Sequence, residues 1–374
     1  MNEPVSALPD PPLSSSESAV VAGAVSPWVL VEITRDPAMR WVLAEGAQPR
    51  RFTRLSRSRV AGSSTVAQQL PSAIAEVVLN RVPYVKVAYP PGGNHMRIMV
   101  VPVLGPASVD PAVMAVQVWA GPRARATPAR PLVGTMVWQV LRTGVGLTSP
   151  ALEVLLDSGA TQARSRSLPD LMRHFEQVED RAGLLGLFDP SRPMGRWSGT
   201  AVTAGVATGA RRNLFLAARS VGHGPHRMVR AVVTDITDGD RVAEPAIATR
   251  VMRALPIKGQ HGIGLIDVRT GLVHEWLRPG PAPLQRWIGE LPVVHPDDVA
   301  ELAATRARLL DGVGSASGSW RLRFDDTEAW VTVTAQWTVL TREHAPQAML
   351  DIRVTPPAVA GDPDRSRAHG GRRS

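Results

Sequence analysis

The chain of 374 residues contains no cysteine. This absence excludes disulfides, thiolate zinc sites, iron–sulfur clusters and a catalytic thiol. No apolar run approaches the roughly 20 residues that a bilayer-spanning helix needs. Residues 1–26 also lack the basic start and continuous apolar core of a signal peptide. We therefore expect a cytoplasmic protein with no membrane span, preceded by a disordered tail over residues 1–26.

Lysine is almost absent as well, since only Lys86 and Lys258 accompany the arginines that produce a formal net charge of +9. An arginine-rich, alanine-rich composition is also typical of a GC-rich genome, so the charge alone does not indicate nucleic acid. Two dense clusters stand out, one at the C-terminal tail and one near residue 50: Arg365, Arg367, Arg372 and Arg373; and Arg50, Arg51, Arg54, Arg57 and Arg59. We interpret the second as a solvated loop, with a surface for nucleic acid or an acidic partner as the alternative. Phe52 is the one aromatic residue within it, which argues against a base-stacking platform.

Turn and linker signals divide the chain into three units. We expect domain 1 over residues 27–121, a linker over 122–130, domain 2 over 131–240, domain 3 over 245–356 and a disordered basic tail over 357–374. In domain 1, hydrophobic periodicity predicts strands over 28–33, 39–44, 96–104 and 113–119, with a helix carrying Val66, Leu70, Ile74, Val77 and Val78.

In domain 2 the pattern predicts a strand over 133–141, a helix over 149–156 and a helix carrying Leu168, Leu171, Phe175 and Val178. Strands are predicted over 196–206, 213–221 and 228–236. Domain 3 should begin with a helical stretch that includes Val251 and Leu255, followed by strands over 262–268 and 272–277.

Residues 293–352 carry the clearest local signals. The sequence His295-Pro296-Asp297-Asp298 predicts a helix start, because an Asp side chain can accept the amide protons of a first turn. An apolar stripe then predicts a helix that ends before Gly312. Alternating residues predict strands over 320–324, 329–340 and 347–354, with a turn at Asp325-Asp326.

The three units end alike. Trp119, Asp235 and Asp351 lie near the end of the last apolar strand of each unit and are separated by equal intervals of 116 residues. Self-similarity at this length predicts three copies of one module.

These segments resemble a known family. The His295–Asp298 entry, its helix, Trp320-Arg321-Leu322-Arg323-Phe324 and Leu350-Asp351-Ile352 resemble the second half of a PAS sensor domain. Thr234-Asp235-Ile236-Thr237 resembles the terminal PAS strand, whereas Gln117-Val118-Trp119 ends a PAS-like or GAF-like unit. From Pro27 to Pro356 the chain resembles actinobacterial triple sensor-domain proteins, whose known mycobacterial member joins PAS/GAF-type domains without an output domain. The resemblance implies an α+β fold of three tandem PAS/GAF-like domains, each an antiparallel sheet of about five strands with helices on one face.

No residue pattern indicates catalysis. His223-x-x-His226 has metal-ligand spacing, but it lies in a Gly/Pro loop without a nearby carboxylate, so a solvated turn is favoured. His295 is better explained by helix entry, and Asp325-Asp326 by a turn. Gly314-Ser315-Ala316-Ser317-Gly318 lacks a nucleophile at its centre, and Gly259, Gly262 and Gly264 do not form a dinucleotide loop.

Ligand binding is the remaining question. His174, on its predicted helix, could hold haem, but local hydrogen bonding is the simpler explanation. Trp276, Trp287, Trp330 and Trp337 could line a small-molecule cavity, with core packing favoured. We assign no catalytic residue, no metal site and no cofactor, and the ligand-binding residues stay open. The sequence thus predicts a non-enzymatic sensor or signalling scaffold that binds a small molecule, a partner signalling protein or both. The first alternative is a regulator that binds nucleic acid or an acidic partner through Arg50–Arg59 and the basic tail. The second is an enzyme on a diverged GAF-like first domain, which would need an acid–base pair that the sequence does not reveal.

Overall fold

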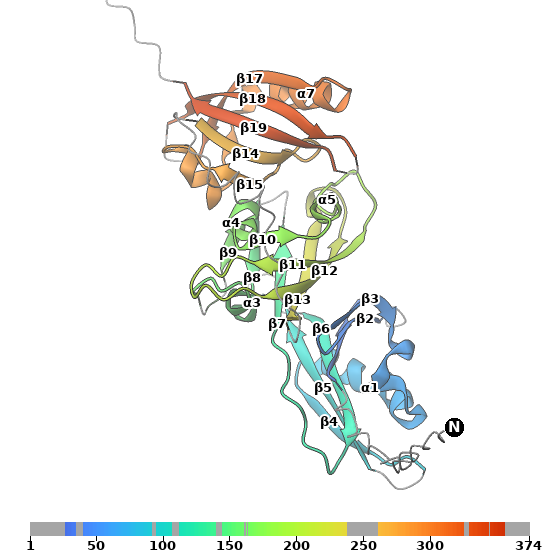
Figure 1. The fold of residues 1–374 in the computed structure, drawn as a ribbon. Coiled ribbons are helices and arrows are strands. Elements are labelled where there is room, and N and C mark those ends of the chain that lie inside the picture. Colours follow the sequence, from blue (N-terminus) through green and yellow to red (C-terminus); the bar gives the residue numbers. More distant parts are fainter. Residues whose placement is uncertain are drawn as a thin grey trace, which may run out of the picture.

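The computed structural model describes residues 27–34, 40–91, 95–106, 112–139, 144–160, 162, 164–237, 261–324, 329–343 and 345–355. In these ranges the chain forms three antiparallel sheets of six, seven and six strands with few helices, so the fold is mostly β. The sheets follow one another along the molecule, with the second in the middle (Figure 1). We call each sheet with its packed helices domain 1, domain 2 and domain 3.

Domain 1 has the sheet order β3-β2-β1-β6-β5-β4. Its strands are β1 (Val29–Glu32), β2 (Trp41–Glu45), β3 (Gln48–Arg54), β4 (Tyr84–Ala88), β5 (Met96–Leu104) and β6 (Val113–Pro122), and its helices are η1 (Leu55–Arg57), η2 (Arg59–Ala61) and α1 (Ser64–Asn80). The apolar stripe of α1, with Val66, Leu70, Ile74 and Val77, packs on one face of the sheet. The predicted hairpin, helix and strand pair are all present.

Domain 2 has the order β10-β11-β12-β13-β7-β8-β9. Its strands are β7 (Val133–Trp138), β8 (Val145–Thr148), β9 (Ser165–Ser167), β10 (Phe175–Val178), β11 (Arg196–Thr203), β12 (Asn213–Val221) and β13 (Met228–Asp235), and its helices are α3 (Pro150–Leu155), α4 (Leu168–Met172), α5 (Arg181–Gly186) and η3 (Gly224–His226). The predicted helix through Val178 is wrong, because it ends at Met172. Phe175 to Val178 instead pair with β11, which satisfies their backbone groups in the sheet.

Domain 3 has the order β15-β14-β19-β18-β17-β16. Its strands are β14 (His261–Asp267), β15 (Val273–Arg278), β16 (Val293–Val294), β17 (Ser315–Arg323), β18 (Val331–Thr341) and β19 (Gln347–Val354), and its helices are η4 (Leu284–Ile288), η5 (Pro296–Asp298) and α7 (Val299–Leu310). Val333, Ala335 and Trp337 of β18 point into the core, as the alternation predicted.

The same five-strand order recurs in all three sheets. When these five strands are numbered in chain order, leaving out the extra strands of each sheet, the order is second, first, fifth, fourth, third: β2-β1-β6-β5-β4, β8-β7-β13-β12-β11 and β15-β14-β19-β18-β17. Trp119, Asp235 and Asp351 lie in β6, β13 and β19, the strands that hold the central position of this order. The equal spacing in the sequence therefore marks equivalent strands.

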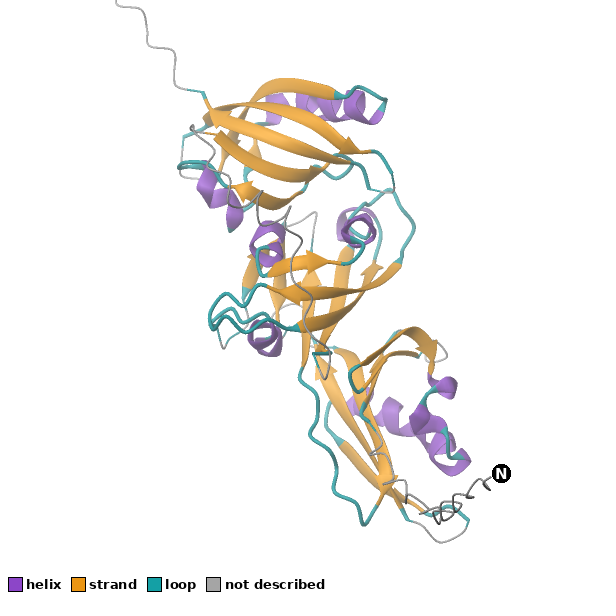
Figure 2. Cartoon of the chain, in the orientation of Figure 1, coloured by secondary structure: helices purple, strands orange, loops and turns teal. Residues whose placement is uncertain are grey.

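Domains 1 and 2 share a second hydrophobic core. Each sheet is covered on one face by its own helices (Figure 2), and the opposite faces of the two sheets meet. Leu30, Leu43 and Met114 of domain 1 pack there with residues of domain 2 such as Phe215 and Val232. Burial of this apolar surface joins the two domains.

Several sequence predictions lie outside the described residues. These are the tails 1–26 and 357–374 with their arginines, the helical stretch around Val251 and Leu255, Gly259, and the Asp325-Asp326 turn.

Candidate functional site: a groove between domains 1 and 2

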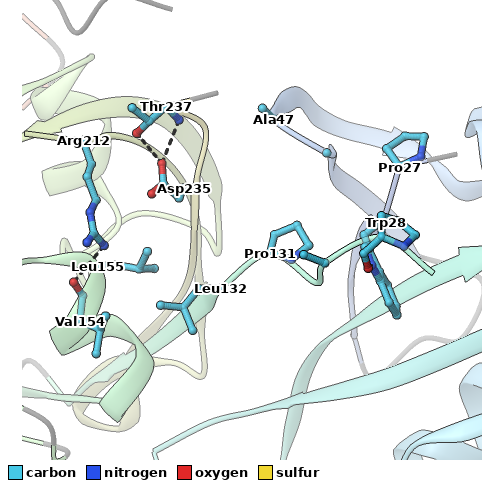
Figure 3. A pocket seen from close by; sticks show the side chains of 13 residues that line it. Pro27, Trp28, Ala47, Pro131, Leu132, Val154, Leu155, Arg212, Asp235 and Thr237 are labelled. Carbon is cyan, nitrogen blue, oxygen red and sulfur yellow. Dashed lines mark hydrogen bonds between the residues drawn. The ribbon is translucent and has the colours of Figure 1, made fainter. Parts of the chain in front are cut away.

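A pocket of about 840 Å³ lies between domains 1 and 2. Its lining comes from the start of β1, the β2–β3 turn, the segment after β6, helix α3 and the ends of β12 and β13: Pro27, Trp28, Gly46, Ala47, Pro128, Ala129, Pro131, Leu132, Val154, Leu155, Arg212, Asp235 and Thr237. Figure 3 shows Trp28 and Pro131 on one side and Leu155, Arg212 and Asp235 on the other. Ligand pockets commonly have this size and lie at domain boundaries.

The wall on the side of domain 1 is held by side-chain hydrogen bonds to the backbone. The Trp28 indole Nε1 donates to the carbonyl oxygen of Pro128 at 3.0 Å, and the Gln117 amide donates to that of Pro131 at 2.8 Å. Beyond Pro122, the last residue of β6, the segment predicted as a linker forms neither helix nor strand, and these hydrogen bonds hold it along the domain 1 sheet. Its prolines further restrict the backbone at this wall.

The wall on the side of domain 2 combines apolar and charged groups. Ser149 caps α3 by accepting the amide proton of Leu152, and this places Val154 and Leu155 at the pocket. Leu132 and Val154 are 42% and 45% exposed, which is unusual for two large aliphatic side chains beside one cavity. The wall thus offers apolar contact surface that no described part of the chain covers.

Two charged residues complete this wall. Arg212 Nη1 donates to the Val154 carbonyl oxygen at 3.1 Å, so its guanidinium lies at the α3 side of the groove (Figure 3). The Asp235 carboxylate accepts the Thr237 amide proton at 2.8 Å. Arg212 has further N–H groups that can donate, and a few convergent polar groups in an apolar pocket orient a ligand.

Two ion pairs connect domain 1 to domain 2. Arg219 of β12 donates two hydrogen bonds to the Glu32 carboxylate of β1, at 2.9 and 2.7 Å. Burial raises the pKa of Glu32, and the charge of Arg219 acts in the opposite direction. Arg51 of β3 donates to Glu179 of domain 2 at 2.9 Å. Both pairs connect domain 1 to domain 2 outside the groove lining.

Arg196 of β11 adds a stacking contact to this interface. Its guanidinium lies 4.5 Å from the Trp41 ring centroid and 5.2 Å from that of Phe52, so a domain 2 cation stacks on two aromatic rings of domain 1. Glu32, Arg196 and Arg219 were not among the site residues predicted from the sequence. A charged residue within an otherwise apolar strand was the available signal, because such a residue must find a partner when buried.

The prediction of a loop at the arginine cluster is wrong. Arg50, Arg51 and Arg54 lie in β3, while Arg57 and Arg59 lie in the two short 3-10 helices that follow. The Glu45 carboxylate is 3.7 Å from Arg50 and 3.8 Å from Arg59. Together with the Arg51–Glu179 pair, these contacts give three of the five arginines a structural role.

His174 lies in the turn between α4 and β10 rather than on a helix. It is buried, and neither ring nitrogen has a hydrogen-bond partner. Burial, with the nearby charge of Arg166, lowers the pKa of His174 to about 4. The ring is therefore neutral at physiological pH. Local hydrogen bonding, the expected explanation for this histidine, is not found at its side chain.

The other histidine candidates occupy turns. His223 and His226 flank and end η3, and the described part of the chain contains no group of three or more residues suited to a metal ion. The His295 ring accepts the Asp297 amide proton at 3.3 Å, which is the helix-entry role expected for it. Asp298, expected to cap the helix, instead accepts hydrogen bonds from Arg321, which lower its pKa to about 2.

The tryptophans of domain 3 mainly pack its core. Trp287 and Trp337 are buried, and their ring centroids lie 5.5 Å from Trp276 and 6.3 Å from Trp320, respectively. Trp330 contacts the His295 ring at 4.6 Å. Trp276 also lines a smaller pocket of about 260 Å³, where Pro169 and Arg173 of domain 2 meet Glu275 and neighbouring residues of domain 3.

Domains 2 and 3 are also in contact. Arg181 of α5 pairs with Glu275 of β15, and the Arg269 Nε lies 3.3 Å from the Asp189 carboxylate. Leu272 and Ala345 of domain 3 pack on the domain 2 core. Domain 2 is therefore joined by packing and by ion pairs to both of its neighbours.

The first domain is similar to one described protein family. The arrangement above defines a three-domain protein of tandem antiparallel sheets with an interdomain groove. Residues 27–129 match the model of the family described as Rv3651-like, N-terminal. No curated protein matches the chain.

Two solved structures are similar to different degrees. A crystal structure of an uncharacterised protein from Mycobacterium tuberculosis matches with a TM-score of 0.66 and 21% identity, covering 88% of this chain and 97% of that one. The shared fold confirms the resemblance to mycobacterial triple-domain proteins. An RNA-binding light-oxygen-voltage receptor matches with a TM-score of 0.23 and 10% identity, covering 59% of this chain and 95% of that one, which is too distant to support an inference. Among the described residues, no helix is both long and apolar enough to cross a membrane.

Proposed function

We propose that the chain is a non-enzymatic, cytoplasmic sensor or signalling scaffold built from three PAS/GAF-like domains. The repeated strand order supports this assignment, since each sheet contains the five-stranded antiparallel core that the PAS/GAF resemblance implies. The helices of domains 1 and 2 lie on one face of their sheets, as in that family. Fold alone does not give function, so the proposal depends on the groove.

The observation that carries the proposal is the chemistry of the groove between domains 1 and 2. Exposed Leu132 and Val154 form an apolar wall, and Arg212 stands at the same wall as a hydrogen-bond donor. This combination suits an elongated, mainly apolar small molecule with a polar or anionic group. A bound ligand contacts both domains at once, so it favours one arrangement of the pair over others and a partner signalling protein can detect the change.

A nucleic-acid role through the arginine cluster has less support. Arg51 already pairs with Glu179, and Arg50 and Arg59 lie beside Glu45. Phosphate contacts would have to compete with these carboxylates, which reduces the positive charge offered to a nucleic acid.

Native mass spectrometry of the protein purified from its own host tests the proposal. We expect added mass on the wild-type chain and its loss in Leu132→Asp, which places a charge in the apolar wall. Leu340→Asp is the matched control, because Leu340 is 56% exposed on β18 of domain 3 and should retain the ligand. An equal loss of ligand in both variants, or a wild-type chain without added mass, would contradict the groove as the binding site. Enzyme-like turnover of nucleotides or esters would contradict the non-enzymatic role.

A further inference from the structure

The strand β4 forms one edge of the domain 1 sheet. In the described part of the chain it pairs with β5 alone, so its other side presents backbone N–H and C=O groups without strand partners. It lies at the end of the sheet order opposite β3, away from domain 3 (Figure 1). A free edge of this kind is a template for pairing with an additional strand.

Large apolar side chains surround this edge and are unusually exposed. Leu79 at the end of α1 is 80% exposed, and Val82 in the following turn is 56% exposed. Val85 within β4 is 58% exposed and Tyr89 just beyond it is 65% exposed. Val85 and Tyr89 share one face of the strand, whereas α1 packs on the opposite face with Ala88. Exposed apolar residues that share a face indicate an interaction site.

The stretch of sequence that contains β4 carries charge of one sign. Between Glu76 and Asp110 the sequence contains no acidic residue, whereas Arg81, Lys86 and Arg97 are basic. Lys86 is exposed at the centre of β4. In a pair of β4 strands centred on each other, Lys86 would oppose Lys86, and like charges directly opposite are destabilising. A second copy of this chain is therefore a poor partner, and an acidic strand is a good one.

We propose that the free edge of β4 binds an extended acidic segment of a partner protein as an added strand. Val85 and Lys86 are consecutive strand residues, so their side chains point to opposite faces of the sheet. The matching segment consequently alternates apolar and acidic residues: the apolar side chains pack on Val85 and Tyr89, and a carboxylate pairs with Lys86. Backbone hydrogen bonds supply affinity, while this alternation supplies specificity. The proposal is independent of the ligand groove.

A fluorescent peptide of about nine alternating Val and Glu residues is the probe, a length that covers a short strand. Its binding to the full-length chain is measured by fluorescence anisotropy at low salt. We expect saturable binding that Lys86→Glu weakens by about tenfold, because an attraction becomes a repulsion. Arg57→Glu changes the net charge equally but lies beyond β3 at the opposite edge, so it should leave the affinity within about twofold. Equal loss in both variants, or no binding to the wild type, overturns the proposal.

Two changes in the peptide test strand addition without altering the protein. Methylating the backbone nitrogens of alternate residues, in either of the two registers, removes the donors on one side of the peptide and keeps its charges. Methylation in one of the two registers should abolish binding to the wild-type chain, because it removes the N–H donors that face β4. A peptide with Lys in place of Glu should also not bind. If both methylated peptides bind as well as the parent, the contact is electrostatic only and the proposal of an added strand is wrong.

Discussion

Arg219 and Glu32 form a two-bond ion pair across 187 residues of sequence, joining β12 of domain 2 to β1 of domain 1. Their side chains are 23% and 12% exposed, so the pair lies at the edge of the apolar core that the two sheets share. A charge held this far from water requires its partner. The pair therefore contributes to how the two domains dock.

Removing one member of this pair should weaken the junction. Arg219→Ala leaves the Glu32 carboxylate partly buried without its main cation, so we expect the free energy of unfolding to fall by about 2 kcal/mol in urea titrations. The double variant Glu32→Gln, Arg219→Ala should recover part of this loss, because no charge is left unpaired. Arg57→Ala serves as a surface control. Unchanged stability in Arg219→Ala would show that the pair does not hold the domains.

A second buried carboxylate should stabilise domain 2 from within. Glu153 has no exposed surface and accepts hydrogen bonds from Arg166, Ser158 and Thr148. Burial alone would raise the pKa of Glu153, but these hydrogen bonds outweigh it and lower the pKa to about 2. Glu153→Gln should lower the free energy of unfolding by about 3 kcal/mol at pH 7, because it leaves the buried Arg166 with only one carboxylate.

The acid dependence of this contribution has a defined sign. The folded-state pKa of Glu153 lies below the unfolded value, so its contribution is complete above about pH 4.5 and is lost as the pH falls towards 2. Glu301→Gln on exposed α7 is the control, and its stability should change by less than about 0.5 kcal/mol. If the two variants lose the same free energy of unfolding at pH 7, the stabilising role assigned to Glu153 is wrong.

The junction of domains 2 and 3 should respond to pH through His274. This buried ring donates from Nε2 to the Gln347 side-chain oxygen at 2.6 Å, since the Gln347 amide nitrogen donates to Asp267 and Ala345. Burial, with the charge of Arg181, lowers the pKa of His274 to about 4. Between pH 6.5 and 4 the unfolded chain binds a proton that the folded chain does not, so stability falls as the pH falls, by up to about 3 kcal/mol.

The variant His274→Gln tests this dependence. Urea titrations at several pH values should show a shallower loss of stability between pH 6.5 and 4, because one titrating group has been removed. His226→Gln, exposed in η3, is the matched control, because it makes the same substitution away from the junction of domains 2 and 3. His174 should contribute a similar slope of its own, so the His274 variant reduces the dependence without abolishing it.

Hydrophobic periodicity predicted many of the helices and strands, because the pattern of buried and exposed positions along an element is visible in its own sequence. The strands β5, β12 and β19 lie where alternation placed them, and α1 carries the stripe read from Val66 to Val78. The pattern failed at Phe175 and Val178, where a spacing that suits a helix also suits a short helix followed by a strand. These residues form a strand because they pair with β11, which is distant in the sequence. The residues around Phe175 do not indicate that partner.

The site was not predictable in the same way. The tryptophans and histidines that the sequence analysis considered were chosen by residue type, whereas the groove is made of ordinary residues such as Leu132 and Val154. Their exposure depends on how the two sheets dock, and the Arg219–Glu32 pair is one of the contacts between these sheets. A charged residue inside an apolar strand is the one trace of that docking in the sequence.

The most direct test of the ligand groove is photocrosslinking from inside it. Val154, 45% exposed in the groove, is replaced by a photoreactive amino acid, and Val299, 52% exposed on α7 of domain 3, is replaced in a matched control. After irradiation in the native host, mass spectrometry of the proteolytic peptides locates any adduct. We predict one defined small-molecule adduct at position 154 and none at 299. An adduct at 299 alone, or no adduct at 154 in a chain that still folds, would contradict the assignment of the groove as the binding site.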